Sequence, residues 1–213
     1  MNVGRLESLA AELGDRSLAG GLGWLAATLE ITGLADEVRI SAGRISELVG
    51  AMKEYTYMDR GAPLEVDVVS GLENTLAILG HKLKGVAVGR EYEENLPKVP
   101  GHAGELNQVW TNLIDNAADA VDGRGRITIK VFESGDRVAV EVADDGPGIP
   151  REVQGRVFEP FFTTKEVGAG TGLGLDTVRR VVAGHGGEVT VESKPGQTRF
   201  TVRLPKGNKE NGG

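Results

Sequence analysis

The sequence predicts an α+β two-layer sandwich in which helices cover one face of an antiparallel or mixed sheet. Amphipathic helical stretches alternate with pairs of strand-like stretches joined by short turns, which is typical of hairpins and not of a doubly wound sheet. Of the 213 residues, 39% are hydrophobic, which is enough to build a core and excludes a disordered chain.

The composition excludes several classes of function. The net charge of −7 argues against a protein that binds nucleic acid or an anionic membrane through bulk charge. The lack of cysteine excludes disulfides, cysteine–zinc sites and thiol nucleophiles. No stretch approaches the ~18 apolar residues of a membrane span, and the N-terminus has no signal-peptide core, so we expect a cytoplasmic protein or the cytoplasmic part of a larger one. Glycine is in surplus, with 32 residues, about twice the usual ~7%.

Residues 1–60 are predicted to form a helical segment. Residues 1–33 have a weak apolar pattern interrupted by glycines, which fits a loosely packed helical lead-in or an element cut from a longer protein. Residues 34–57 have mostly apolar positions every seven residues, in two series offset by four. This pattern fits either an amphipathic helix packed on its own domain or a dimerisation helix. The two series are Leu34, Ser41, Leu48 and Tyr55, and Val38, Ile45 and Met52.

Residues 61–205 are predicted to form the sandwich, and residues 206–213 a disordered tail. A strand at Glu65–Val68 precedes a helix whose N-terminus is a predicted capping box of Ser70 and Glu73. Four leucines at helical spacing mark the buried face of this helix: Leu72, Leu76, Leu79 and Leu83. The further predicted elements are a strand Val86–Tyr92, a loop Leu96–Gly101, a helix Gly104–Val121, a hairpin of Ile127–Glu133 and Arg137–Ala143, a short helix Pro150–Val157, a glycine-rich loop Gly168–Gly174 opening a helix that ends at Ala183, and a hairpin of Glu188–Ser193 and Thr198–Leu204.

A first candidate cluster lies on the long helix. Asn112 and Asn116 are four residues apart and share a face with Asp119. Amide oxygens at this spacing suit a hard cation such as Mg²⁺, which takes phosphate oxygens and water as its other ligands. The alternative is a row of polar residues on a solvated helix face.

The second cluster, Asp144-Asp-Gly-Pro-Gly148, directly follows a predicted strand. Asp144 can accept the N–H of a planar base with an exocyclic amine, and Gly146 and Gly148 let the backbone approach such a base closely. The alternative is an ordinary tight turn, for which this sequence is also suitable.

The third and fourth clusters follow one another. Phe158-Glu-Pro-Phe-Phe-Thr-Thr-Lys165 places three phenylalanines beside two hydroxyls and a lysine, where the alternative is a hydrophobic plug at the base of a loop. Gly168-Ala-Gly-Thr-Gly-Leu-Gly174 has glycines at alternate positions before a helix. Its backbone N–H groups and the helix N-terminus can hold an anion, although the pattern is neither that of P-loop nor that of Rossmann proteins. The alternative is a flexible loop.

Together these stretches resemble bacterial sensor histidine kinases. Asn112-Leu-Ile-Asp-Asn116-Ala, Asp144-Asp-Gly-Pro-Gly-Ile, Phe158-Glu-Pro-Phe-Phe and Gly170-Thr-Gly-Leu-Gly-Leu resemble, in this order, the N, G1, F and G2 boxes of that family. The resemblance implies the Bergerat (GHKL) ATP-binding fold, with ATP and Mg²⁺ as cofactors. It extends into residues 34–57, which resemble the second dimerisation helix, and it implies a homodimer through that helix and a response regulator receiver domain as partner.

The resemblance also implies roles for single residues. Asp144 would bind the adenine amino group, Asn116 would ligate Mg²⁺, and Asn112 and Lys165 would be the catalytic residues beside the phosphates. The implied nucleotide-binding residues are Asn112, Asn116, Asp119, Asp144, Gly146, Gly148, Lys165, Gly170, Thr171, Gly172, Leu173 and Gly174.

Two further positions decide which reaction is expected. The hydrolytic relatives carry a glutamate that activates water four residues before the Mg²⁺ asparagine, and here that position is Asn112, which cannot act as a general base at neutral pH. The three histidines, His81, His102 and His185, all follow the heptad stretch, and we expect none of them to be the phosphoacceptor. The expected function is therefore transfer of the ATP γ-phosphate to a histidine on a dimerisation helix that this chain does not contain. The alternatives are an ATP-binding regulatory or docking module without kinase activity, a serine kinase of the anti-sigma-factor type, and, less favoured, a gyrase-like ATPase.

Overall fold

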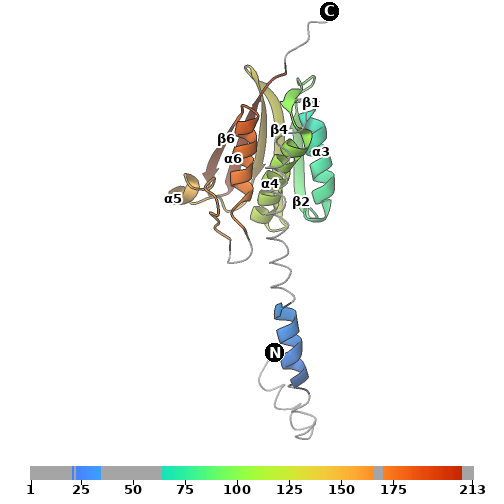
Figure 1. Cartoon of the computed structure of the whole chain (residues 1–213), viewed down its shortest axis with the longest axis vertical. Coiled ribbons are helices and arrows are strands. Elements are labelled where there is room, and N and C mark those ends of the chain that lie inside the picture. The colour runs from blue at the N-terminus through green and yellow to red at the C-terminus, as the bar shows by residue number, and fades with distance from the viewer. Residues whose placement is uncertain (1–20, 22, 35–63, 166–169, 208–213) are drawn as a thin grey trace, which may run out of the picture. The chain divides into compact units, whose positions relative to one another are not determined.

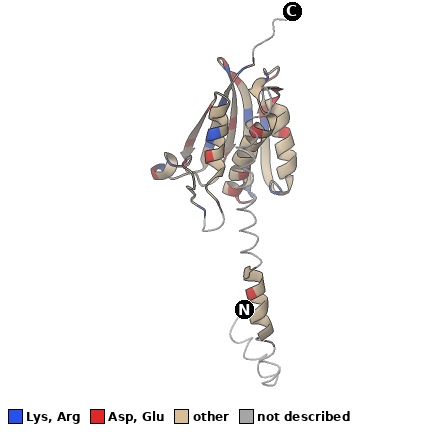
Figure 2. Cartoon of the chain, viewed as in Figure 1, with Lys and Arg blue, Asp and Glu red and all other residues tan. Residues whose placement is uncertain are grey.

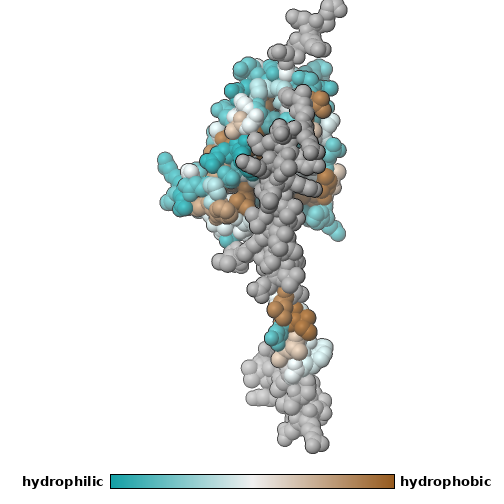
Figure 3. Space-filling model, in the orientation of Figure 1, coloured by the Kyte–Doolittle hydropathy of each residue, from teal (hydrophilic) through white to brown (hydrophobic). Residues whose placement is uncertain are grey.

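The structure is a computed structural model that describes residues 21, 23–34, 64–165 and 170–207. The chain divides into two units, residues 1–58 and residues 59–213. In the first unit, residues 23–34 form a helix that exposes large apolar side chains, among them Trp24 at 70% and Leu29 at 66% exposure (Figure 3). The heptad stretch predicted at 34–57 lies outside the described residues except for Leu34. No helix in the described part of the chain is long and apolar enough to span a membrane.

The second unit is a mixed five-stranded sheet with three main helices on one face, as Figure 1 shows. The strand order is β2-β4-β5-β7-β6, in which β2 is parallel to β4 and every other pair of neighbours is antiparallel. The strands of this sheet are β2 (Val86–Tyr92), β4 (Gly125–Ser134), β5 (Arg137–Asp144), β6 (Glu188–Lys194) and β7 (Gln197–Pro205), and the helices are α3 (Val68–Ile78), α4 (Ala103–Val121), α5 (Arg151–Gln154) and α6 (Gly174–Gly184), with a 3₁₀ turn η1 (Leu79–His81) after α3. The predicted α+β two-layer sandwich is confirmed.

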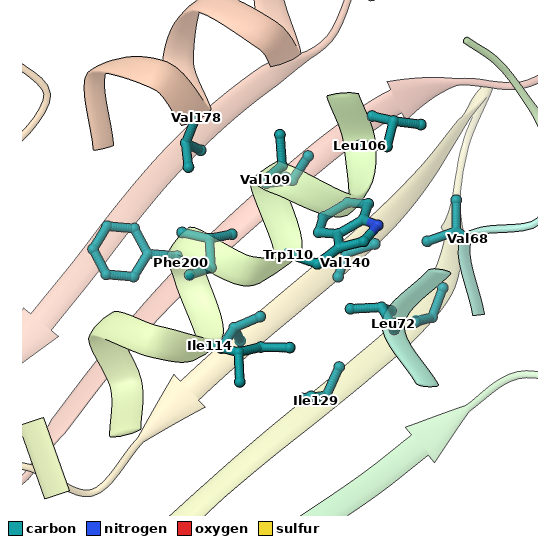
Figure 4. Close-up of a cluster of buried hydrophobic side chains, with 14 of the residues drawn as sticks. Val68, Leu72, Leu106, Val109, Trp110, Ile114, Ile129, Val140, Val178 and Phe200 are labelled. Carbon is teal, nitrogen blue, oxygen red and sulfur yellow. The ribbon is translucent and has the colours of Figure 1, made fainter. Parts of the chain in front are cut away.

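The core lies between the sheet and the helix layer. Alternate residues of β4 point inward, and Ile127, Ile129 and Val131 are fully buried. Trp110 of α4, also fully buried, lies against α3, where a Cβ on Gly71 would come within 3.4 Å of its ring nitrogen (Figure 4). The four leucines predicted to share a buried face are all buried, with exposures of 0–8%. Burial of this apolar layer fixes α4 across the centre of the sheet, and α4 carries one side of the candidate site.

The predicted capping box at the start of α3 is wrong. The N-cap is Asp67, whose Oδ1 accepts the Ser70 N–H at 3.1 Å, so the helix begins at Val68. Glu73 does not reach back to the helix end. Its Oε1 instead accepts hydrogen bonds from Arg90 Nε at 2.8 Å and from the Tyr92 hydroxyl at 2.7 Å on β2. Glu73 is therefore held by residues of β2 that are distant in sequence, and not by the backbone of its own helix.

The segment predicted as a loop before α4 contains a short strand, β3 (Val99–Gly101), which pairs antiparallel with β1 (Leu64–Val66). Pro100 is tolerated there because this two-stranded sheet offers it an edge position. The predicted tail begins in an ordered way, since Lys206 N–H donates to the Asp136 carbonyl at 3.2 Å and Gly207 N–H to the Lys98 carbonyl at 2.9 Å. Residues 208–213 lie outside the described part.

Candidate functional site

Asp144 ends β5 in the middle of the sheet, where its neighbours in register are Ile127 on β4 and Thr198 on β7. The residue is only 5% exposed, and its Oδ1 accepts the Gly146 N–H at 3.0 Å. Burial, aided by the nearby Asp145 charge, raises the pKa of Asp144 in spite of that hydrogen bond. An ionised aspartate has about four lone-pair positions. Asp144 can therefore accept a further donor from a ligand.

The turn after Asp144 is held tightly between α4 and the β6–β7 hairpin. A Cβ on Gly146 would lie 2.9 Å from the Ala120 carbonyl, and Gly148 has φ +84° with its Cβ position 2.4 Å from the Lys194 carbonyl oxygen. Arg126 N–H donates to Asp145 Oδ1 at 2.8 Å and fixes the turn from the other side. Only glycine fits at positions 146 and 148, so the conformation of this turn is fixed by its packing against α4 and the β6–β7 hairpin.

Thr198 is a buried polar neighbour of Asp144 that the sequence did not reveal. It lies opposite Asp144 on β7, so both side chains point to the same face of the sheet. It is 3% exposed, and its hydroxyl lies 3.0 Å from the Ser193 hydroxyl. The register of β5 and β7 is what places Thr198 beside Asp144, and the hydrophobic pattern of the sequence does not predict that register.

α4 presents Asn112, Asn116 and Asp119 on the side away from the core. Asn112 Oδ1 lies against the start of α6, where a Cβ on Gly174 would approach it to 3.1 Å. α6 has no side-chain cap, since Leu173 occupies its N-cap position. The N–H groups of the first turn of α6 and the positive end of its dipole therefore lie beside Asn112, which is an arrangement that suits phosphate.

The described part of the glycine-rich segment, residues 170–174, packs on the phenylalanine-rich stretch. Gly172 has φ +69°, and a Cβ there would lie 2.4 Å from the Phe161 carbonyl carbon. Phe158 packs edge-to-face on Phe200, with ring centroids 6.2 Å apart, but Phe161 is 73% exposed and has φ +64°. Of the three phenylalanines, only Phe158 therefore packs against the core. The strained backbone of Phe161 instead lies directly against Gly172.

Lys165, at the end of this stretch, contacts α4. Its ammonium donates to Asp119 Oδ2 at 2.5 Å. Lys82, which follows η1, lies 2.5 Å from Asp119 Oδ1 and 2.5 Å from Asp115 Oδ1. Lys82 thus links the predicted site residue Asp119 to Asp115, which lies outside the predicted site, and because 33 residues separate Lys82 from Asp115, no local pattern could link them. In the ribbon of Figure 2, the positions of basic and acidic residues are likewise interspersed.

The histidines differ in accessibility. His185 is 4% exposed at its side chain, its Nε2 accepts the His102 N–H at 3.0 Å, and its Nδ1 lies 2.8 Å from the Val181 carbonyl. Both nitrogens are engaged, so His185 is a structural tether between α6 and the start of α4. His81 and His102 are exposed.

Comparison with known proteins places these features among ATP-binding domains. Residues 101–208 match the family described as "Histidine kinase-, DNA gyrase B-, and HSP90-like ATPase". The chain is 34% identical to the sensory histidine kinase/phosphatase NtrB of Rhodobacter capsulatus over 98% of its own length and 63% of the NtrB length. It is therefore shorter than two thirds of this relative.

Solved structures show the same fold. The chain is similar to the catalytic domain of the histidine kinase ThkA, with a TM-score of 0.63 and 29% identity over 68% of this chain and 97% of that one. It is also similar to full-length ShkA in complex with AMPPNP, with a TM-score of 0.66 and 26% identity over 78% of this chain and 36% of that one.

Proposed function

The chain belongs to the family of histidine kinase-, DNA gyrase B- and HSP90-like ATPases, and we propose that its second unit is the ATP-binding catalytic domain of a two-component sensor histidine kinase. The observation that carries this proposal is the buried carboxylate of Asp144, whose turn packs on Ala120 of α4, the helix that carries the asparagines and contacts the uncapped start of α6. A base acceptor and a phosphate cradle at one site fit a nucleotide. The names of NtrB and ThkA support the histidine kinase branch of the family.

Asp144 selects the base. Its carboxylate accepts the adenine amino N–H, and Gly146 and Gly148, which pack on the Ala120 and Lys194 carbonyls, hold the turn that positions this carboxylate. Thr198 adds a hydroxyl on the same face of the sheet. Because Asp144 and Thr198 are buried, hydrogen bonds to them are stronger than those formed in water.

The triphosphate lies between α4 and the lid, which consists of Phe158–Lys165 and residues 170–174. Gly170, Thr171, Gly172, Leu173 and Gly174 offer backbone N–H groups, and Lys165 reaches the γ-phosphate. The donor set of α4 fits Mg²⁺, since Asn116 supplies a neutral amide oxygen on the side that Asn112 and the start of α6 share. When bound there, Mg²⁺ would neutralise charge on the phosphates.

Asn112 favours transfer over hydrolysis. It stands one turn before Asn116, where a general base would have to lie to activate water, and an amide cannot take that proton at neutral pH. The acceptor is an imidazole nitrogen. Its lone pair forms the N–P bond as the bond from the γ-phosphorus to the bridging oxygen breaks and ADP leaves.

The acceptor and the partners lie outside the described residues. Since His185 is buried and tethered, and His81 and His102 both follow the heptad stretch, we propose that the acceptor histidine comes from a separate dimerisation helix. We also propose that residues 34–57 pair with a second copy and that a response regulator receiver domain takes the phosphate.

The test is to incubate the full chain with ATP labelled on the γ-phosphate, alone and with a histidine-kinase dimerisation domain that carries the acceptor histidine. We expect acid-labile label on that domain and none on the chain alone, because the chain supplies the site and the domain supplies the nucleophile. A domain whose acceptor histidine is replaced by alanine is the matched control and should stay unlabelled. Steady phosphate release by the chain alone would indicate an ATPase, and acid-stable label would indicate a serine kinase. Either result contradicts the proposal.

A further inference from the structure

We propose that Asp119 is a positioning residue that holds the lid lysine, Lys165, until a γ-phosphate takes this lysine over, and that Asp119 recaptures it once the phosphate has been transferred. This inference rests on the proposed function, because it places ATP between α4 and the lid. It gives Asp119 a role in lid exchange instead of a direct contact with the nucleotide.

The exchange needs only a short movement. Asp119 follows Asn116 by three residues on the same side of α4, which corresponds to about 4.5 Å of helix rise. The Lys165 ammonium, 2.5 Å from Asp119 Oδ2, therefore lies within one helical turn of the residue proposed to ligate Mg²⁺. A flexible lysine side chain can cover this distance by changing its rotamer.

The lid base is fixed independently of this ion pair. Thr163 Oγ1 accepts the Lys165 N–H at 3.1 Å, and a Cβ on Gly170 would lie 2.9 Å from that hydroxyl oxygen and 3.1 Å from Lys165 Cδ. The backbone and the aliphatic stem of Lys165 are thus packed between the two ends of the lid. Only the charged head has to change partners.

Lys82 makes the release inexpensive. A partly buried carboxylate that loses its only cation is costly, but Asp119 also has Lys82 at 2.5 Å from its other oxygen. Burial acts to raise the pKa of Asp119, yet hydrogen bonds from Lys165 and Lys82 outweigh it and hold the pKa below its usual range. When Lys165 leaves for the γ-phosphate, Asp119 stays charged and paired with Lys82.

The exchange distinguishes substrate from product. ATP has the γ-phosphate that competes with Asp119 for Lys165, and ADP does not. After transfer, Lys165 returns to Asp119, and ADP keeps no contact with the lid lysine. Asp119 therefore weakens ATP binding modestly and leaves ADP binding unchanged.

The experiment measures ATP and ADP affinity by calorimetry for the full chain and for Asp119→Asn, Lys165→Met and the double variant. Asp119→Asn should tighten ATP binding by about 2- to 5-fold, as expected for a partly exposed ion pair, and leave ADP affinity within error. In the Lys165→Met background the same change should have no effect on ATP, because nothing remains to be released. Asp115→Asn is the matched control, since it removes a neighbouring carboxylate that contacts Lys82 but not Lys165.

Three results would overturn the exchange. The first is that Asp119→Asn still tightens ATP binding in the Lys165→Met background. The second is that Asp119→Asn tightens ADP binding equally, or that Asp115→Asn tightens ATP binding equally. The third is that Asp119→Asn weakens ATP binding, which would mean that Asp119 assists the ligand directly. If the wild-type chain binds no ATP, the proposed function fails together with the exchange. If the wild-type chain binds ATP but the effects of the Asp119 and Lys165 substitutions are independent, the exchange is refuted and the proposed function stands.

Discussion

Replacing Asp144 with asparagine is expected to weaken ATP binding by about 100-fold while the free protein stays folded. A hydrogen bond to a charged group contributes about 1.5–3 kcal/mol, which corresponds to roughly 10- to 150-fold in affinity. The asparagine amide also adds a donor that must face either the Gly146 N–H, now 3.0 Å from Asp144 Oδ1, or the adenine amine. Calorimetric titration with Mg·ATP measures the change.

The same substitution should leave the free energy of unfolding unchanged or raise it. The pKa of Asp144 is raised by burial, so near that pKa the folded state binds more protons than the unfolded state. Stability contributed by this group therefore falls as the pH rises through the folded pKa, and at neutral pH the ionised carboxylate is a cost that asparagine removes. Asp145 is an exposed carboxylate of the same turn, and Asp145→Asn is therefore the control. This variant should bind ATP nearly normally. Unchanged ATP affinity in Asp144→Asn would refute the adenine assignment.

Gly148→Ala should destabilise the protein by about 2–5 kcal/mol. An alanine at φ +84° costs about 1–2 kcal/mol. Its Cβ would in addition lie 2.4 Å from the Lys194 carbonyl oxygen, so the backbone must shift, which adds about 1–3 kcal/mol. The shift also displaces Gly146 and Asp144, so ATP affinity should fall.

Gly196→Ala separates the two causes, because Gly196 has φ +81° but open space around its Cβ position. Its free energy of unfolding, measured by urea denaturation, should fall by only about 1–2 kcal/mol. Equal losses for the two variants would show that the close approach to Lys194 does not hold in solution.

Local pattern predicted most of the fold. The long helix α4 and the hairpins have strong periodicity, so their existence and approximate bounds were predictable, and Asp144 was predictable as a strand-end carboxylate because its motif is contiguous. The start of α3 was missed because Ser70 and Asp67 are both good caps, and the choice depends on Glu73 being held by Arg90 and Tyr92.

The rest of the site depends on contacts that are distant in sequence. Thr198 joins Asp144 only through the register of β5 and β7, and Lys82 reaches Asp115 and Asp119 only when α3 packs on α4. The partner of Lys165 was likewise invisible, since 46 residues separate it from Asp119. These pairings follow from tertiary packing, which a single sequence does not specify.

The most direct test is whether the site at Asp144 binds adenine nucleotides, measured by calorimetric titration of the full chain with Mg·ATP and Mg·GTP. Adenine presents an amine donor where guanine presents a carbonyl acceptor, so a carboxylate acceptor must discriminate between them. We expect clear binding of ATP and, by the same hydrogen-bond arithmetic, about 100-fold or more weaker binding of GTP. Equal affinities for the two nucleotides, or no binding of ATP, would contradict the account.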